Sequence, residues 1–339
     1  MQQVITTTHT IDSESFIQSF LNPHQPLLIK AYAPASTSKK QLQSVVSLFG
    51  SHPMQVKIPY IEQLQAQSSL EQNPEVMSLE DFIVRLEQSP SCRQCMVEEP
   101  TPASVLEQIG IPDLTWGRGV GELVSNTFVA GKGNHAQLHF DCDQRHVLLM
   151  QLFGRKRVFL IHPKDSPKLL PVLNQSWWML QNMALDCKRH LLSSCEYWEV
   201  ELEPGDMIYI PMMFWHHIDY LDTGVSVNFR FGNRPENTFI SEHLHRDSFI
   251  QRLSLFLDST DDDLARQAIM TALKERLSES YSSAFEAYSC IRQRASELCQ
   301  LYCEDWSGEQ FVLDYEESMV RGTPALMRII QGFYQGRVE

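Results

Sequence analysis

The triplet His139-Phe140-Asp141 constrains this chain of 339 residues more than any other short stretch. On a β-strand, residues i and i+2 point to the same face, so one strand can aim an imidazole and a carboxylate at a common point. The later stretch 203–217, EPGDMIYIPMMFWHH, supplies a further histidine, either His216 or His217. We therefore expect two imidazoles and one carboxylate to meet at a metal ion.

Two histidines and one carboxylate, with open positions beside them, form the facial triad of non-haem Fe(II) oxygenases. An HxD triplet alone is weak evidence, because many strands carry polar residues on a solvated face. The combination is more specific, since the triplet is followed by Gly154-Arg-Lys-Arg157, Pro204-Gly-Asp206 and Trp215-His-His217. The sequence predicts an iron site whose third ligand follows the strand beginning at 204–206, which faces the HxD strand across a barrel.

Short β-runs separated by turns fill the middle of the chain, from about residue 114. The predicted strands cover residues 121–130, 135–141, 146–153, 156–162, 197–202, 206–211 and 224–231. Many short strands punctuated in this way indicate a sandwich or a barrel. Residues 163–196 form a longer insertion that contains Trp177 and Trp178, and insertions of this length are typical of lids or binding loops.

The pattern divides the chain into a flanking region at 1–113, a barrel at 114–235 and a helical region at 236–339. In the first region, apolar spacing predicts helices over 12–22, 38–49 and from Ser78 onward, a strand at 26–30, a loop with some helix at 53–76 and a linker at 88–102. In the last region, it predicts helices over 238–256, 262–277, 279–303 and 308–333. We expect these C-terminal helices to form a homodimer, because their apolar stripes have no other assigned task.

Composition narrows the classes of partner. The 28 lysines and arginines are outnumbered by 42 aspartates and glutamates, which gives a net charge of −14 and argues against broad binding to nucleic acid or anionic membranes. The N-terminus lacks a basic and an apolar signal region, and no apolar run is long enough to span a bilayer, so we expect a cytoplasmic protein. Cys92 and Cys95 form a lone CxxC without a second ligand pair, which favours thiols in a loop over a zinc site.

The stretch 121–232 resembles the cupin-like JmjC family of Fe(II)- and 2-oxoglutarate-dependent oxygenases, most closely the branch that contains the asparaginyl hydroxylase of hypoxia-inducible factor. The matching pieces are LHFD at 138–141, LLMQLFGRKR at 148–157, EPGDMIYIPMMFWHH at 203–217 and VSVNFRFG at 225–232. The resemblance implies a mainly β fold with α-helices, whose core is a double-stranded β-helix, or jelly roll. It assigns the metal ligands to His139, Asp141 and His216, with His217 as the alternative.

The same resemblance assigns the binding of 2-oxoglutarate. Lys156 matches the family lysine that pairs with the C5 carboxylate, and Arg230 is the competing cation for that carboxylate. Asn228 matches an asparagine that contacts the co-substrate near the iron. This chain departs from the family at Ala136, where a threonine is usual, and after Asp141, where an insertion places Val147 at the position of an asparagine.

The activity implied is that of a dioxygenase that uses Fe(II), 2-oxoglutarate and O2, forms succinate and CO2, and hydroxylates a side chain of a protein substrate. The alternatives are a JmjC demethylase, an RNA-modifying hydroxylase, or a cupin-fold scaffold that holds metal without turnover. Residues 212–215 could supply apolar walls for the site, although core packing explains them equally well.

Overall fold

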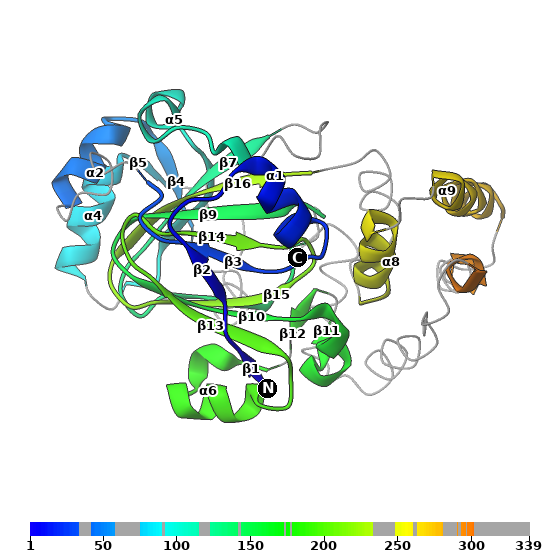
Figure 1. Ribbon diagram of the computed structural model, residues 1–339. Coiled ribbons are helices and arrows are strands. Elements are labelled where there is room, and N and C mark those ends of the chain that lie inside the picture. The colour runs from blue at the N-terminus through cyan, green and yellow to red at the C-terminus, as the bar shows by residue number, and fades with distance from the viewer. Residues whose placement is uncertain are drawn as a thin grey trace.

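The fold is known from a computed structural model. It describes residues 1–33, 42–57, 75–89, 92–114, 123–141, 144–172, 174–176, 178–232, 248–259, 263–280, 290, 293–295 and 297–301. Two sheets of seven strands face each other as a jelly roll (Figure 1). This confirms the predicted mainly β core with flanking helices.

The first sheet carries the HxD strand. Its order is β1 (Gln2–Gln3), β13 (Tyr197–Leu202), β10 (Lys156–Ile161), β15 (Trp215–Tyr220), β8 (His135–His139), β12 (Gln175–Ser176) and β11 (Pro171–Val172). The second sheet has the order β2 (Thr6–Thr8), β3 (Leu27–Ile29), β14 (Met207–Ile210), β9 (His146–Phe153), β16 (Gly224–Phe231), β7 (Val124–Ala130) and β6 (Cys95–Pro100). The central neighbours are antiparallel, whereas β1 joins β13 and β2 joins β3 in parallel.

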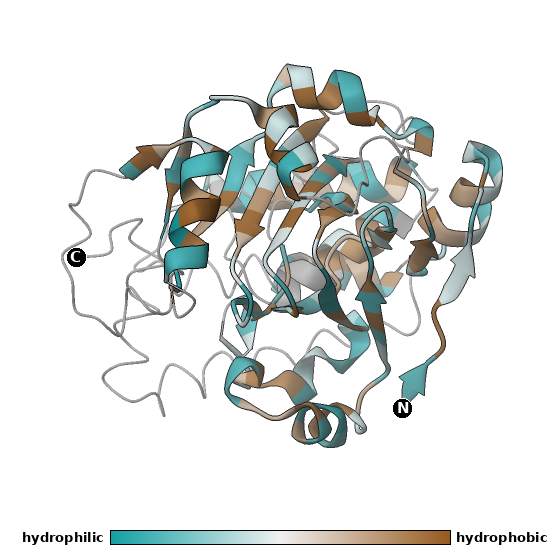
Figure 2. Cartoon of the chain, turned by 90° about the vertical axis from the view of Figure 1, so that its left-hand side faces the viewer, coloured by the Kyte–Doolittle hydropathy of each residue, from teal (hydrophilic) through white to brown (hydrophobic). Residues whose placement is uncertain are grey.

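The inner strands are buried on both faces, which explains why they read as continuous apolar runs. On β10, Val158 and Leu160 pack between the two sheets, whereas Phe159 and Ile161 pack on the outer face of the first sheet. Figure 2 shows apolar and polar residues alternating along many of the surrounding elements. On β10, residues i and i+2 thus share a face, as strand geometry requires.

Helices surround the two sheets, and the two C-terminal ones lie beyond one end of the strands (Figure 1). The helices are α1 (Ser13–Phe16), η1 (Ile17–Leu21), α2 (Leu42–Phe49), α4 (Leu79–Gln88), α5 (Ala103–Ile109), η3 (Pro163–Leu169), η4 (Leu180–Asn182), α6 (Leu185–Leu192), α8 (Ser248–Ser259) and α9 (Asp263–Leu277). Two of the predicted helix starts are capped, since Asp12 accepts a hydrogen bond from the Ser15 amide and Ser78 accepts one from the Asp81 amide. Within the described residues, no helix has the length and apolar character needed to cross a membrane.

Several predicted elements were wrong. Residues 88–102 are not simply a linker, because β6 pairs with β7 at the edge of the second sheet. The region predicted as loop with some helix contains β4 (Met54–Val56) and β5 (Glu75–Met77), which form a small sheet of their own. The flanking region thus also supplies β1, β2, β3 and β6 to the two large sheets, while the division into three regions stays a prediction.

Two further expectations concern the thiols and the C-terminal helices. Cys95 is buried in β6 rather than placed in a loop, and neither it nor Cys92 forms a disulfide. The helix predicted over 262–277 corresponds to α9, and the second half of the one predicted over 238–256 corresponds to α8, while residues 238–247 lie outside the described residues. The helix predicted over 279–303 is described only in part, and the one predicted over 308–333 lies outside the described residues.

Candidate functional site

His139 and His216 are direct cross-strand partners on the neighbouring strands β8 and β15. Their ring centroids lie 4.3 Å apart, and the register shifts immediately after this pair. The prediction that the third ligand comes from a strand across the barrel was wrong, because both strands belong to the same sheet. His216 also lies within a strand, which the sequence did not reveal because Trp215–Tyr220 contains three polar residues and no clear alternation.

Asp141 lies two residues beyond the end of β8, and its carboxylate reaches both imidazoles. Asp141 Oδ1 is 3.5 Å from His139 Nε2 and 3.8 Å from His216 Nε2. Two hydrogen bonds with Asn174 hold the intervening Phe140 in place. The Asn174 side-chain amide donates to the Phe140 backbone carbonyl at 2.9 Å, and the Asn174 backbone carbonyl accepts from the Phe140 backbone amide at 3.0 Å. No sequence pattern pointed to Asn174, because it lies in the insertion.

Backbone carbonyls orient both imidazoles. His139 Nδ1 lies 2.6 Å from the Gln137 carbonyl, and His216 Nδ1 lies 3.1 Å from the Phe214 carbonyl. A carbonyl only accepts, so each Nδ1 donates to it, and in the neutral imidazole each Nε2 keeps the lone pair that binds a metal ion. This is the tautomer that a metal ligand requires.

The charges at the cluster also suit a cation. Burial lowers the pKa of His216 to about 4, and the neighbouring His139 adds to this effect, so His216 is neutral near pH 7. Burial raises the pKa of Asp141, but the Arg230 guanidinium and the two imidazoles outweigh it and lower the pKa overall. Burial lowers the pKa of His139, but its hydrogen bond and charge interaction with Asp141 raise the pKa overall. A carboxylate and two imidazoles therefore converge on one point, where all three donor atoms lie within 4.8 Å of one another.

His217, the alternative ligand, points away from this cluster. Its Nε2 lies 3.0 Å from Lys188 Nζ and 3.0 Å from Asp219 Oδ1 on the outer face of β15, beneath α6. The Lys188 ammonium in turn lies 2.6 Å from both carboxylate oxygens of Asp219. Adjacent residues on a strand face opposite ways, so only one of the two histidines can join His139.

A cavity of about 300 Å³ opens beside the three converging residues, and Lys156 is part of its lining. The Lys156 ammonium contacts the Ser226 hydroxyl and lies 4.3 Å from the centre of the Tyr220 ring. Burial lowers the pKa of Lys156 to about 7. Ser226 and Tyr220 were not predicted, although parity with Asn228 and with His216 could have placed both inside the barrel.

The other predicted co-substrate residues also line the cavity. The Asn228 amide oxygen accepts a hydrogen bond from the Asn126 backbone at 3.1 Å, which fixes the side chain. Arg230 lies beside the metal cluster, 3.6 Å from Asp141 Oδ2, and also 3.3 Å from Glu98. Ala136 and Val147, the two departures from the family, are lining residues that add only apolar surface.

The four residues from Met212 to Trp215 do not line the cavity. They are buried in two apolar clusters, so the packing explanation for them holds. In the insertion, Gln175 of β12 borders the cavity next to β8. Trp177 lies outside the described residues, and a lid formed by the insertion stays a prediction.

The donor set fits Fe(II), because two imidazoles and a carboxylate on one side of an ion leave the opposite positions open to the cavity. The cavity also fits 2-oxoglutarate, since a buried ammonium such as Lys156 is a natural partner for a carboxylate that leaves water. Both assignments rest on the geometry of this chain's own side chains.

Comparison with known proteins supports this interpretation. The family model of the cupin-like domain matches residues 13–237. JmjC domain-containing protein D of Dictyostelium discoideum is 33% identical over 107 residues, which cover 30% of this chain and 23% of that protein. Lysine-specific demethylase 8 of Danio rerio is 27% identical over 241 residues, which cover 65% of this chain and 56% of that protein.

A protein whose name refers to tRNA is also similar to this chain. The tRNA wybutosine-synthesizing protein 5 of Homo sapiens is 30% identical over 112 residues, which cover 33% of this chain and 35% of that protein. The matches thus span from about a quarter to just over half of the length of these curated relatives. The match to the family model includes the candidate metal centre and every strand of the two sheets except β1 and β2, and this chain belongs to the cupin-like JmjC family.

Proposed function

We propose that this protein is an Fe(II)- and 2-oxoglutarate-dependent oxygenase that hydroxylates a side chain of a protein substrate. The observation that carries the proposal is the convergence of His139, Asp141 and His216 beside a cavity that also holds a buried lysine. When bound there, Fe(II), 2-oxoglutarate and O2 would supply an oxidative decarboxylation that yields succinate and CO2 and oxidises a C–H bond. As part of the same proposal, we place the protein in the cytoplasm.

Each residue has a task in this proposal. The three converging side chains hold the ion from one side. Lys156 pairs with the far carboxylate of 2-oxoglutarate, while Asn228 contacts the co-substrate near the ion. Arg230 neutralises part of the charge of Asp141. The apolar lining, which includes Ala136 and Val147, limits water beside the reacting group.

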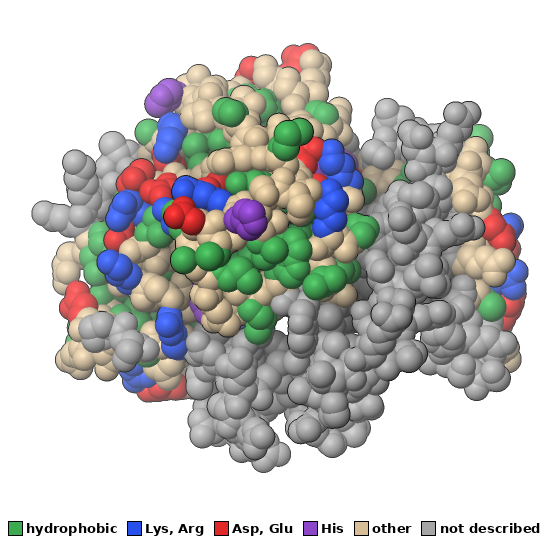
Figure 3. Space-filling view, turned by 90° about the horizontal axis from the view of Figure 1, so that it is seen from below, with side chains coloured by type: hydrophobic (Ala, Val, Ile, Leu, Met, Phe, Trp, Pro, Cys, Tyr) green, Lys and Arg blue, Asp and Glu red, His purple; other side chains and the backbone are tan. Residues whose placement is uncertain are grey.

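A protein substrate is favoured over a nucleic acid by charge. The chain carries a net charge of −14, which repels a polyanion. On the face shown in Figure 3, the described acidic and basic side chains lie close to one another and do not gather into a broad basic surface. The similarity to a tRNA-modifying relative keeps RNA as the second candidate, and that to lysine-specific demethylases keeps demethylation as a third.

Turnover of 2-oxoglutarate by the full chain tests the oxygenase activity. Succinate should form with Fe(II) and ascorbate, and its formation should fall to background in His139→Ala. His190→Ala is the matched control, since it removes an exposed histidine of α6. Equal succinate formation by wild type and His139→Ala would refute the metal assignment, and a failure to bind 2-oxoglutarate would favour the scaffold alternative.

The substrate class needs a separate readout. Proteins captured by the His139→Ala variant are incubated with the wild-type enzyme and analysed by mass spectrometry. We expect a side chain that gains one oxygen atom. Loss of a methyl group with release of formaldehyde would show a demethylase instead, and oxygen incorporation into co-purified RNA would show the RNA-modifying alternative.

A further inference from the structure

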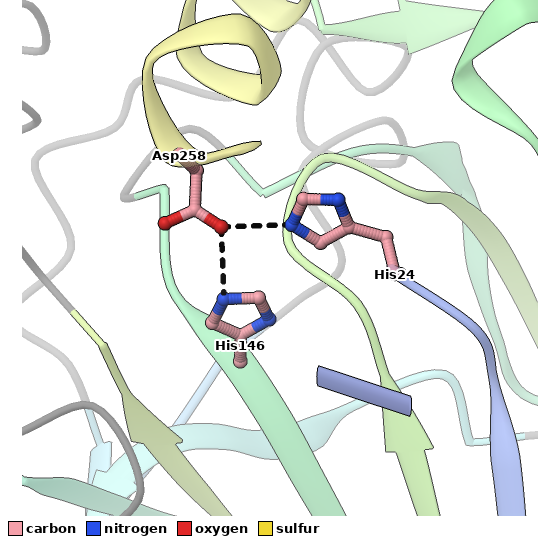
Figure 4. Close-up of side chains that lie close together, drawn as sticks. All are labelled: His24, His146 and Asp258. Carbon is pink, nitrogen blue, oxygen red and sulfur yellow. Dashed lines mark hydrogen bonds and ion pairs between the residues drawn. The ribbon is translucent and has the colours of Figure 1, made fainter. Parts of the chain in front are cut away.

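A second cluster of metal-ligating side chains lies away from the candidate iron site. His24 follows η1, His146 is the first residue of β9, and Asp258 is in the last turn of α8. Figure 4 shows the two imidazoles pointing at the same carboxylate from different segments of the chain. The cluster thus joins the N-terminal segment, the barrel and the C-terminal helical region.

The distances suit ligands of one small ion. Asp258 Oδ2 lies 2.8 Å from His24 Nε2 and 3.7 Å from His146 Nε2. Tetrahedral ligands about 2.05 Å from zinc are about 3.3 Å apart, and these two distances lie on either side of that value. Shifts of well under 1 Å would therefore bring the carboxylate oxygen to zinc spacing from each imidazole, and all three donor atoms already lie within 4.8 Å of one another.

Burial and the helix dipole make a cation favourable here. The side chains of Asp258 and His146 are both 0% exposed, and that of His24 is only 11% exposed. A carboxylate that leaves water is costly, and Asp258 also lies near the negative end of the dipole of α8. A divalent ion would place a positive charge beside both the carboxylate and the end of the helix.

The backbone of His24 and the neighbours of His146 fix the positions of the two imidazoles. His24 has a left-handed backbone with φ of +50°, in the turn after a helix where glycine is the usual choice. The His146 ring packs against Gly232, where a Cβ atom would come within 2.8 Å of His146 Cδ2. Its Nδ1 lies 2.8 Å from the Tyr209 hydroxyl, and when Nδ1–H donates a hydrogen bond to that oxygen, Nε2 carries the lone pair that binds a metal ion.

We propose that His24, His146 and Asp258 bind a structural zinc ion that fastens α8 to the barrel. Imidazole ligands favour zinc over Mg²⁺ and Ca²⁺, which take oxygen ligands. The second oxygen of Asp258 or a water completes the coordination. The proposal is independent of the proposed oxygenase activity, because it uses none of the same side chains.

A metal-free arrangement of the same residues makes a different prediction. The Met212 amide lies 3.3 Å from His146 Nδ1, and without metal this nitrogen accepts from Met212 and Tyr209. Nε2 then carries the proton and faces Asp258, which gives a carboxylate held by two imidazoles. That arrangement would bind no zinc at this cluster, and adding zinc would not raise the thermal stability of the protein.

Zinc binding by tag-free, full-length protein decides between the two. In a background with both His139→Ala and Asp141→Ala, which removes the first cluster, we expect one equivalent of zinc after dialysis against Zn²⁺. Adding His24→Gln or Asp258→Asn to that background should abolish it. Adding His190→Gln, which changes an exposed histidine, should leave it intact.

Thermal unfolding gives a second readout for the same proteins. At a zinc concentration 100-fold above the dissociation constant, the midpoint of the EDTA-treated background protein should rise by about 5 °C, and His24→Gln should remove this shift. If Asp258→Asn does not fold, His24→Gln still tests the site, because His24 lies in a turn at the edge of the cluster. The proposal is overturned if the background protein binds no zinc, or if the His24→Gln and His190→Gln variants bind equal amounts.

Discussion

Lys156 is a buried amine that lines the cavity, and its protonation controls what it can bind. Burial lowers its pKa to about 7, from an ordinary value of 10.5, because the charged form loses its hydration. A carboxylate ligand pairs with the ammonium form only. Binding of 2-oxoglutarate is therefore linked to the uptake of a proton whenever the pH is above about 7.

The affinity for 2-oxoglutarate should accordingly fall as the pH rises above about 7, by up to about tenfold per pH unit. Titration calorimetry of the wild-type protein at a series of pH values measures this. Lys156→Arg keeps a positive charge at every pH used, so its affinity should vary much less with pH. The assignment of Lys156 fails if Lys156→Met binds the co-substrate as tightly as wild type.

Asn174 supports the metal cluster without touching it. Its side-chain amide fixes the carbonyl of Phe140, which separates His139 from Asp141. We expect Asn174→Ala to weaken Fe(II) binding about 10- to 100-fold, the range found for groups that orient metal ligands. The Fe(II) concentration for half-maximal succinate formation should rise while the maximal rate changes less, and equal values for wild type and variant would contradict this role.

Among the elements, β15 presents functional side chains on both of its faces. His216 faces the cavity, whereas His217 and Asp219 face α6 and contact the buried Lys188. The side chain of Lys188 is 5% exposed and that of Asp219 is 21% exposed, so the pair is largely shielded from solvent. The ion pair therefore ties the insertion to the strand that carries a candidate metal ligand.

Lys188→Met should destabilise the protein by about 2–3 kcal/mol, because it leaves the Asp219 carboxylate without its cation. Urea unfolding at pH 7 measures the loss, and Asp219→Asn in the same chain should recover part of it. Burial raises the pKa of Asp219, but His217 and Lys188 outweigh it and lower the pKa to about 2. The pair's contribution to stability is thus full above about pH 4 and is lost as the pH falls toward 2. A Lys188→Met variant as stable as wild type would contradict this role.

For the whole molecule, the prediction that remains is homodimerisation through the C-terminal helices. Leu264 of α9 and Leu301 are each 74% exposed, and we expect them to contribute to the dimer contact. Light scattering at micromolar concentration should give twice the mass of 39.1 kDa. Leu264→Lys should lower the measured mass toward one chain, and a monomeric wild-type protein would refute the prediction.

Much of the barrel could be predicted from local pattern. The apolar runs at 146–153 and 156–162 became β9 and β10 almost residue for residue, because a strand buried on both faces must be apolar throughout. The strand Trp215–Tyr220 escaped prediction, because its polar residues are paired by partners distant in sequence, such as Lys188. The edge strand β6 was mistaken for a linker for a similar reason, since its partner β7 begins more than twenty residues later.

The sequence by itself determined the chemistry of the candidate site: an HxD triplet, a histidine after a tryptophan, and a lysine after a glycine turn. These depend on residue type and on short spacing, which local rules of strand geometry interpret. Only the tertiary structure decided which strand carries the second imidazole, which carbonyls set the tautomers, and that His24, His146 and Asp258 form a second cluster. The members of the second cluster are more than a hundred positions apart, and His139 and His216 are also far apart in the sequence, so their distances depend on how the sheets and helices pack together.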